Sequence, residues 1–406
     1  MTEALAHGVG ERSDLPIPLF YAYAGAFAAL VVSFLALGLL WADSRFRGDR
    51  AGRVVPLRLP GRPARIVTLL LALHTTGLLL LGPVEDNAAP HLVYVLFWVG
   101  LVPASLLFGP VWRSLSPFRL LPDRPRRALP ARLGYWPAAG GLLAFTWTEL
   151  VAPEPAAPPT LLVFGAGYAA VQLAGTRVYG HAWLERGDPF EAYSTLVGQL
   201  SPLGRRADGT RVLRNPFDGL DAVEPAPGLV ATVCVLLGST GYDGFSTAPA
   251  WVDALQSGPL GRTALGTLGL LATVAVVALL YGGCLGLAGL IGGTRGLAPR
   301  FAHTLVPIAL GYLVAHYFSL FVIEGQRTLV LALRLDLVVD QNAVAPETIA
   351  IVQVLAIVAG HVAGVVAAHD RSVRLLPEAR AVAGQIPLFV LMLAYTLGGL
   401  TLLFAA

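Results

Sequence analysis

The sequence predicts an all-α fold, a polytopic bundle of about ten transmembrane helices with both termini outside. Of its 406 residues, 55% are hydrophobic and only 13% are charged, whereas a soluble globular protein has about 25% charged residues. The mean hydropathy of +0.68 agrees with this deficit of charge. The composition therefore indicates a multi-pass integral protein of the cell membrane, with the lipid bilayer as its surroundings.

Long apolar runs recur along the chain, and a helix needs about 17–25 such residues to cross a bilayer. Ten runs of uneven quality are found with a sliding window. They span residues 19–41, 66–81, 91–108, 136–151, 160–174, 228–254, 263–291, 301–323, 347–368 and 386–404. Pro103 predicts a kink in the third run, and a glycine-rich stretch interrupts the sixth run.

The distribution of arginine predicts the orientation of the helices. All 28 basic residues are arginines, and 24 of them lie in the connections after the first, third, fifth, seventh and ninth runs. Loops on the cytoplasmic side of membrane proteins are enriched in basic residues. This alternation places the arginine-rich loops in the cytoplasm and both termini outside.

No separate soluble domain is expected, so residues 1–406 are predicted to form a single transmembrane domain. Residues 1–18 lack the basic start of a secretory signal and are expected to be an outside N-terminal tail. The longest cytoplasmic loop, residues 177–227, contains an amphipathic segment around residues 189–200. The acids and arginines of the loop, together with Phe190, Tyr193 and Leu196 of this segment, predict an interfacial helix.

Several classes of function find no support in the sequence. No basic stripe interleaved with aromatic residues is present, so nucleic-acid binding is not expected. The sequence contains no Walker loop, no nucleophile elbow and no dinucleotide fingerprint. Its two cysteines, Cys234 and Cys284, lie inside apolar runs without a metal-binding spacing, and are expected to be small buried hydrophobes.

Three histidines lie near the middle of three different apolar runs. They are His74 in the second run, His316 in the eighth and His361 in the ninth. Ionisable residues at this depth normally face a bundle interior or a cavity, and three converging imidazoles are a common ligand set for zinc or another divalent ion. The alternative is that each histidine makes a single interhelical hydrogen bond. No compact metal motif decides between the two.

Two further residues are candidates for catalysis. Asp243 lies in a stretch with three glycines, GSTGYDGFS (238–246), where a broken helix would line a cavity. The alternative is that the stretch is the outer end of a short helix, with Asp243 as its cap. Tyr312 lies one turn before His316 on the same helical face, from which its hydroxyl would donate to developing charge.

Five stretches resemble one known family. They are FGPVWRSLSPFR (108–119), GDPFEAYSTLVGQLSP (187–202), STGYDGFS (239–246), HTLVPIALGYLVAHYFS (303–319) and GHVAGVVAAHDR (360–371). They are similar to a family of actinobacterial polytopic membrane proteins commonly labelled fenitrothion hydrolase. The resemblance implies hydrolysis of an organophosphate P–O–aryl bond, and it supplies no catalytic residue set.

Two functional hypotheses follow. In the first, the protein is a membrane-embedded hydrolase of hydrophobic phosphotriester-like substrates, and a divalent metal ion held by His74, His316 and His361 activates water. In the second, the protein is a transporter or ion-binding permease, and the histidines relay protons or bind ions. A hydrophobic small molecule is the expected substrate, and the sequence leaves open a partner membrane subunit or a homo-oligomer.

Overall fold

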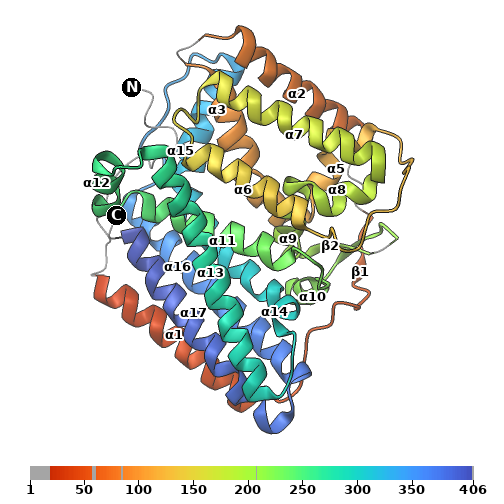
Figure 1. Cartoon of the computed structure of the whole chain (residues 1–406), viewed down its shortest axis with the longest axis vertical. Coiled ribbons are helices and arrows are strands. Elements are labelled where there is room, and N and C mark those ends of the chain that lie inside the picture. Colours follow the sequence, from red (N-terminus) through yellow and green to blue (C-terminus); the bar gives the residue numbers. More distant parts are fainter. Residues whose placement is uncertain (1–18, 57–60, 84–85, 207, 405–406) are drawn as a thin grey trace. The chain divides into compact units, whose positions relative to one another are not determined.

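A computed structural model describes residues 19–56, 61–83, 86–206 and 208–404 (Figure 1). Nearly all regular structure in these residues is helical, with one small three-stranded sheet. The predicted all-α class is therefore confirmed. The expected N-terminal tail, residues 1–18, lies outside the described residues.

Nine helices in the described part of the chain are long and apolar enough to cross a membrane. Each corresponds to one of the ten expected runs. The fourth run forms α6 (Trp136–Leu150), which has only 15 residues and is shorter than the roughly 20 residues that a spanning helix needs. The chain is a multi-pass membrane protein in which this run is a short helix.

The described chain divides into two compact units. Unit 1 contains residues 51–216 and 319–345, and unit 2 contains residues 19–50, 217–318 and 346–404. The boundary falls inside α15 (Val306–Leu333), whose first half belongs to unit 2 and whose second half belongs to unit 1. Each unit is described by itself.

Unit 1 consists of helices and one small sheet. Besides α6 and the second half of α15, its helical elements are α2 (Gly61–Leu81), α3 (Ala88–His91), the π-helix η1 (Leu92–Val99), α4 (Leu101–Phe108), α5 (Trp112–Leu115), the 3-10 turn η2 (Pro117–Leu120), α7 (Pro158–Tyr179), α8 (His181–Gly187) and α9 (Pro189–Gly198). The strands β1 (Arg53–Val54), β2 (Leu203–Arg205) and β3 (Arg211–Leu213) pair antiparallel in the order β1-β3-β2.

The core of unit 1 is aromatic and is centred on α9. The ring of Trp98 stacks on Tyr193 with centroids 4.6 Å apart, and Phe145 packs edge-on against Phe190 at 5.2 Å. Nine of the ten residues of α9 are buried. A helix forms in the segment expected to be interfacial, but its side chains are covered by other parts of the unit. Phe190 and Tyr193 meet aromatic rings, and Glu191 pairs with Arg119.

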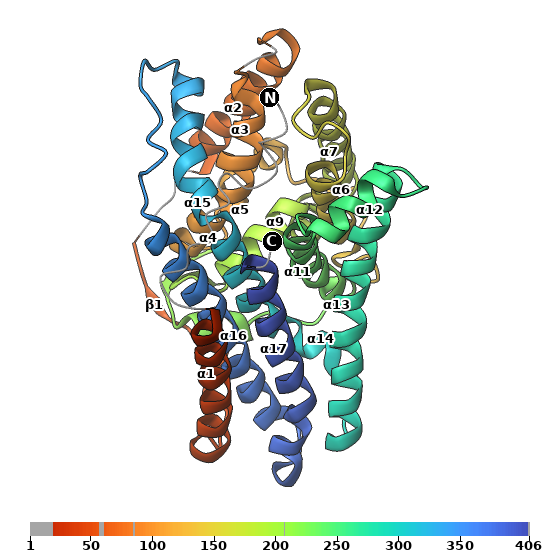
Figure 2. The ribbon, with the colours of Figure 1, turned by 90° about the vertical axis from the view of Figure 1, so that its left-hand side faces the viewer.

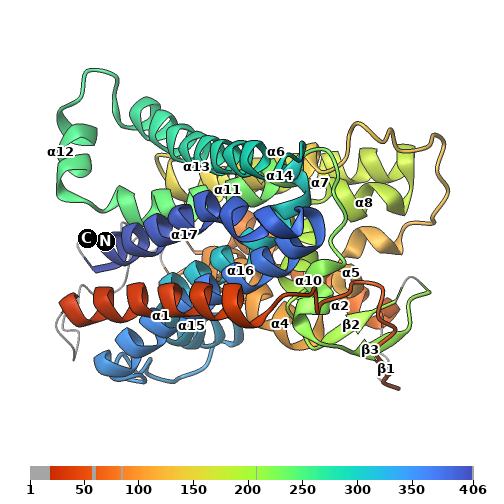
Figure 3. The same cartoon turned by 90° about the horizontal axis from the view of Figure 1, so that it is seen from below.

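Unit 2 is a bundle of long helices. Besides the first half of α15, its elements are α1 (Leu19–Leu40), α10 (Pro216–Asp221), α11 (Leu229–Ser246), α12 (Pro249–Ser257), α13 (Arg262–Gly292), α14 (Leu297–Phe301), the 3-10 turn η3 (Ala302–Leu305), α16 (Pro346–Leu375), the 3-10 turn η4 (Glu378–Arg380) and α17 (Ala381–Phe404). The helices α1, α16 and α17 lie side by side (Figure 2). On the other side of α17, α13 packs against both α17 and α11 (Figure 3).

Glycine allows close helix packing in unit 2. A side chain at Gly311 on α15 would meet the carbonyl of Ala356 on α16 at 2.5 Å, and one at Gly360 would meet the carbonyl of Pro307 at 2.5 Å. Small residues let membrane helices approach closely. The two glycines therefore bring α15 against α16 in the segment that carries His316 and His361.

The helix α11 continues through Gly238, Gly241 and Gly244 and ends at Ser246, so the break expected at these glycines is wrong. The run is interrupted just afterwards, between α11 and α12, and Asp243 lies in the last turn of α11. This resembles the alternative of a short helix that ends here, but the cap residue is Thr247 and not Asp243. Gly238 instead packs on α13, where a side chain would lie 2.7 Å from the Cα of Val274. The glycine-rich composition reflects helix packing, and Asp243 lies within a regular helix.

Candidate functional site

The structure pairs two of the predicted site residues, Asp243 and His316, within unit 2. The Nε2 atom of His316 on α15 lies 2.8 Å from Oδ2 of Asp243 on α11. The Asp243 side chain is 4% exposed and that of His316 is 28% exposed. Two residues far apart in the sequence thus form a polar contact inside a bundle of membrane-spanning helices.

The hydrogen bond determines which imidazole nitrogen carries the hydrogen. A carboxylate oxygen accepts, so Nε2 of His316 is the donor and a neutral ring has its lone pair at Nδ1. No residue in the described part of the chain is recorded as a partner of Nδ1. A proton added at Nδ1 would give an imidazolium beside a carboxylate, which is a pair without net charge.

Tyr317 completes this group and was missed by the sequence analysis. Its hydroxyl donates to Oδ2 of Asp243 at 2.9 Å, and its ring lies edge-on to that of His316 with centroids 4.9 Å apart. The imidazole and the hydroxyl therefore meet at one carboxylate oxygen. The position of Tyr317 directly after His316 was the available signal, but neighbouring residues on a helix point in different directions.

Tyr312 has a different partner from the one expected. Its hydroxyl donates to the backbone carbonyl of Tyr395 on α17 at 2.8 Å, and the Tyr395 hydroxyl donates to the carbonyl of Val277 on α13 at 3.1 Å. The Tyr312 hydroxyl was predicted to stabilise charge on a substrate. In this structure it connects α15 to α17.

His361 is buried beside Tyr312. Its side chain lies on α16 with no exposed surface, and its ring centroid is 6.0 Å from that of Tyr312. The Nδ1 atom is 2.9 Å from the carbonyl of Ile357, so Nδ1 carries the hydrogen. The Nε2 atom is buried and has no hydrogen-bond partner among the described residues.

The three histidines predicted to bind a metal have separate surroundings. His74 lies in unit 1 on an exposed position of α2, whereas His316 contacts Asp243 and His361 contacts Ile357. Within the described ranges, no three His, Cys, Asp or Glu side chains lie close enough together to hold a metal ion. The described residues therefore do not fit the expected zinc site.

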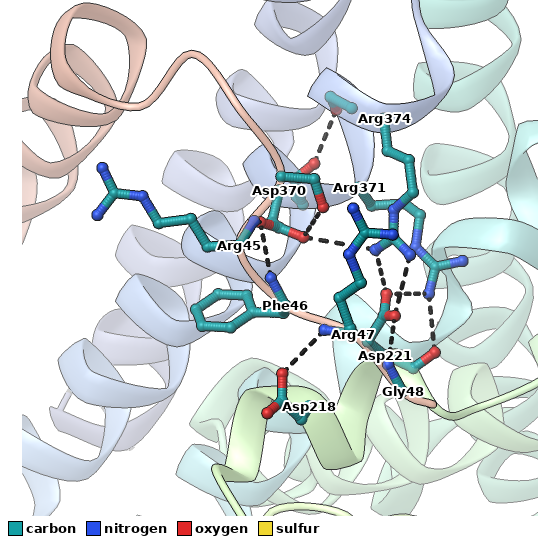
Figure 4. A network of polar contacts seen from close by, with 12 residues as sticks. Arg45, Phe46, Arg47, Gly48, Asp218, Asp221, Asp370, Arg371 and Arg374 are labelled. Atoms are coloured by element: carbon teal, nitrogen blue, oxygen red, sulfur yellow. Dashed lines mark hydrogen bonds and ion pairs between the residues drawn. The ribbon is translucent and has the colours of Figure 1, made fainter. Parts of the chain in front are cut away.

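A polar network fixes one end of unit 2 (Figure 4). Four consecutive backbone amides, those of residues 45–48, donate to three carboxylates: two to Asp370, one to Asp218 and one to Asp221. Successive amides form a concave site suited to negative charge. The network ties the chain after α1 to α10 and to the end of α16.

Two arginines strengthen this network at Asp221. The guanidinium of Arg371 donates to the carboxylate at 2.8 Å, and Arg374 binds both carboxylate oxygens (Figure 4). Burial alone would raise the pKa of Asp221, but the hydrogen bonds from Arg374 and Gly48 and the charge of Arg371 bring the pKa below its ordinary value. The end of α16 is therefore held by an ionised carboxylate.

Unit 1 contains a buried acid outside its spanning helices. Asp188 caps α9 through the amide of Phe190 at 3.0 Å and accepts from Trp112 Nε1 and the Tyr168 hydroxyl, both at 3.1 Å. Burial, followed by the nearby charge of Glu191, raises the pKa of Asp188 to about 7. Because its recorded contacts are the cap and two aromatic side chains, Asp188 serves the packing of this unit.

Among the polar groups described, the Asp243–His316 pair with Tyr317 is the strongest candidate site. It combines an imidazole, a carboxylate and a hydroxyl at hydrogen-bond distance within the spanning helices. Comparisons of the chain with protein-family models, with curated proteins and with solved structures find no match.

Proposed function

We propose that the chain is a transporter of the cell membrane that couples substrate movement to a proton bound at the Asp243–His316 pair. The observation that carries this proposal is the 2.8 Å contact between His316 Nε2 and Asp243 Oδ2. Ionisable residues within membrane helices typically mark proton relays and ion pathways. The expected substrate is a hydrophobic small molecule.

Charge balance explains why this pair suits a proton. With a neutral imidazole, the buried pair carries the negative charge of Asp243, which accepts from His316 and Tyr317. An unbalanced charge in an apolar environment is costly. Protonation at His316 Nδ1 removes the net charge, so occupation by a proton changes the energy of the helices around the pair.

Proteoliposomes that contain a pH-sensitive dye test the proposal. An imposed pH gradient is expected to drive a protein-dependent proton flux, which the substitutions Asp243→Asn and His316→Gln abolish. The matched control is His74→Gln, since His74 is exposed on α2 of unit 1. Equal proton flux in all variants, or no flux above that of empty liposomes, would refute the proposal.

A second candidate function is hydrolysis of a phosphotriester. It is favoured by the 28% exposure of the His316 side chain, whose Nε2 is oriented by a carboxylate. This is the arrangement of a general base. Nδ1 would take a proton from water as its oxygen bonds to phosphorus and would return that proton to the departing aryloxide, so the products are a dialkyl phosphate-type acid and a phenol.

Fenitrothion added to the purified protein in detergent separates the two functions. Release of its phenol without any gradient, abolished by His316→Gln and by Asp243→Asn, would favour hydrolysis. Proton flux in liposomes without phenol release would favour transport. If His316→Gln changes neither activity, both functions lose their proposed site.

A further inference from the structure

Unit 1 contains a second buried pair of an imidazole and a carboxylate, formed by His91 and Glu324. The Nδ1 atom of His91, the last residue of α3, lies 3.5 Å from Oε2 of Glu324 in the second half of α15. The two residues are 4% and 2% exposed, respectively. Neither sequence nor resemblance assigned a role to this pair.

The facing atoms of the pair make no hydrogen bond to any described residue. Among the described residues, both His91 Nδ1 and Glu324 Oε2 are buried without a hydrogen-bond partner. A distance of 3.5 Å exceeds that of a normal N–H···O hydrogen bond. A buried carboxylate oxygen without a hydrogen-bond donor is costly, so a proton shared by these two atoms would stabilise the pair.

The surrounding charges only partly balance Glu324. Arg327, one turn later on α15, places its Nε atom 3.5 Å from the same Oε2, and its side chain is 43% exposed. Asp86 is the other charged group near His91. Because the Arg327 side chain is far more solvated than that of Glu324, its charge is screened and balances the buried carboxylate only in part.

The backbone at His91 is unusual as well. The π-helix η1 begins at Leu92, directly after His91, and continues for eight residues. π-helical segments are rare and often occur at functional sites. The local distortion and the unpaired polar atoms are independent observations on the same part of unit 1.

We propose that His91 and Glu324 form a proton-binding site in unit 1. One added proton lies between Nδ1 and Oε2, either as a carboxylic acid that donates to the imidazole or as an imidazolium that donates to the carboxylate. In both forms the two unpaired atoms become donor and acceptor. A proton needs no cavity, which agrees with the tight burial of both side chains. The proposal is independent of transport, since it concerns binding alone.

Titration of the purified full-length protein tests this site. The proton uptake is measured between mildly alkaline and mildly acidic pH in unbuffered detergent solution, for Glu324→Gln, His91→Gln and the double variant. We expect each single variant to take up about one proton fewer than the unsubstituted protein. The double variant should also take up about one proton fewer, and not two. A shared site gives this non-additive result.

Infrared difference spectra of the same samples show where the proton resides. We expect either a carboxylic acid band that disappears in Glu324→Gln or imidazolium bands that disappear in His91→Gln. The control is Glu347→Gln, which replaces an exposed acid at the start of α16 and leaves the His91–Glu324 pair in place. Unchanged uptake in both single variants, or additive losses in the double variant, would overturn the proposal.

The result is distinct from that of the transport experiment. Proton flux depends on Asp243 and His316 in unit 2, whereas the titration counts a proton held by His91 and Glu324. If the protein shows no proton flux but takes up the expected proton in the titration, the transport proposal fails and the His91–Glu324 site stands. If it shows proton flux but the titration finds no shared proton, the His91–Glu324 site fails and the transport proposal stands. Glu324→Asp provides a second test if Glu324→Gln does not fold, because the shorter carboxylate should shift the infrared bands without removing the acid.

Discussion

The Nε2 atom of His316 lies 2.8 Å from Oδ2 of Asp243, and the same oxygen accepts from Tyr317 at 2.9 Å. This contact joins α11 to the first half of α15 inside unit 2. The carboxylate orients the imidazole, and the tyrosine stabilises the carboxylate. The three side chains thus form one hydrogen-bonded group, and removing one of them changes the environment of the other two.

Substitutions at Asp243 are expected to follow a definite order of stability. Asp243→Ala leaves the donors of His316 and Tyr317 without an acceptor, and breaking a buried pair in this way costs roughly 3–5 kcal/mol. Asp243→Asn retains one carbonyl oxygen, so its cost should be smaller. Tyr317→Phe removes one hydrogen bond to a charged group, worth about 1.5–3 kcal/mol.

Thermal unfolding in detergent measures this order. We expect the largest decrease in the unfolding temperature for Asp243→Ala and smaller decreases for the other two variants. Ser257→Ala, at the end of α12, is a suitable control because its hydroxyl bonds only within its own helix. An Asp243→Ala protein as stable as this control would show that the pair makes no contribution to stability.

The sequence was sufficient for the helices but only partly for the site. Apolar run length predicts spanning helices because each run must satisfy its own backbone in lipid, and nine such helices are present in the described residues. Depth along the helices selected His316, which contacts Asp243, and His361, which is fully buried. It also selected His74, which is exposed on α2, because depth along a helix says nothing about which way a side chain faces.

Glycine in α11 was misread for a related reason. Glycine both weakens a helix and permits close packing, and the sequence does not distinguish these roles without knowing the neighbouring helix. At Gly238 that neighbour is Val274 on α13. The His91–Glu324 pair was similarly out of reach, since it joins residues from distant runs through tertiary packing.

Gly399 is expected to tolerate no side chain. A Cβ atom at this position would overlap the Tyr312 hydroxyl, which donates to the Tyr395 carbonyl. Gly399→Ala must therefore displace Tyr312, and overpacking of this kind costs about 1–3 kcal/mol. Thermal unfolding should show a lower unfolding temperature.

Tyr312→Leu in the Gly399→Ala background tests the cause of that loss. Removal of the ring relieves the overlap, so the double variant should be less destabilised than the sum of the two single variants. Gly398→Ala is the matched control, because no atom lies within 4 Å of a Cβ placed there. Additive losses would mean that Gly399 acts through something other than Tyr312.

The network at the end of α16 should make stability depend on pH in the acidic range. The lowered pKa of Asp221 means that the unfolded chain binds its proton at higher pH than the folded protein does. The stabilisation is therefore fully present above the unfolded pKa and is lost as the pH falls through the folded pKa. Unfolding temperatures measured on the acidic side should decrease accordingly.

Asp221→Asn should remove this acidic dependence and lower stability near neutral pH by about 2 kcal/mol, because charged hydrogen bonds from Arg371 and Arg374 are lost. Asp49→Asn, at an exposed position of the same unit, should leave the profile unchanged. A profile of Asp221→Asn that parallels that of the unsubstituted protein would contradict the assignment of the acidic dependence to Asp221.

Asp188 should produce a pH dependence of the opposite sign. Its pKa is raised from 3.8 to about 7, first by burial and then by the charge of Glu191. Between these values the folded protein binds more protons than the unfolded chain, so stability decreases as the pH rises through this window. A shift of this size corresponds to at most about 4 kcal/mol.

Asp188→Asn should remove this decrease, since the amide stays neutral at all pH values. Its carbonyl oxygen can still accept from Trp112 or from the Phe190 amide, so the fold should persist. The measurement is the unfolding temperature in detergent from pH 5 to pH 8, with Glu154→Gln as an exposed control in unit 1. The substitution removes only the titration of Asp188. If the unfolding temperature of Asp188→Asn falls with rising pH as steeply as that of the control, another group causes the decrease.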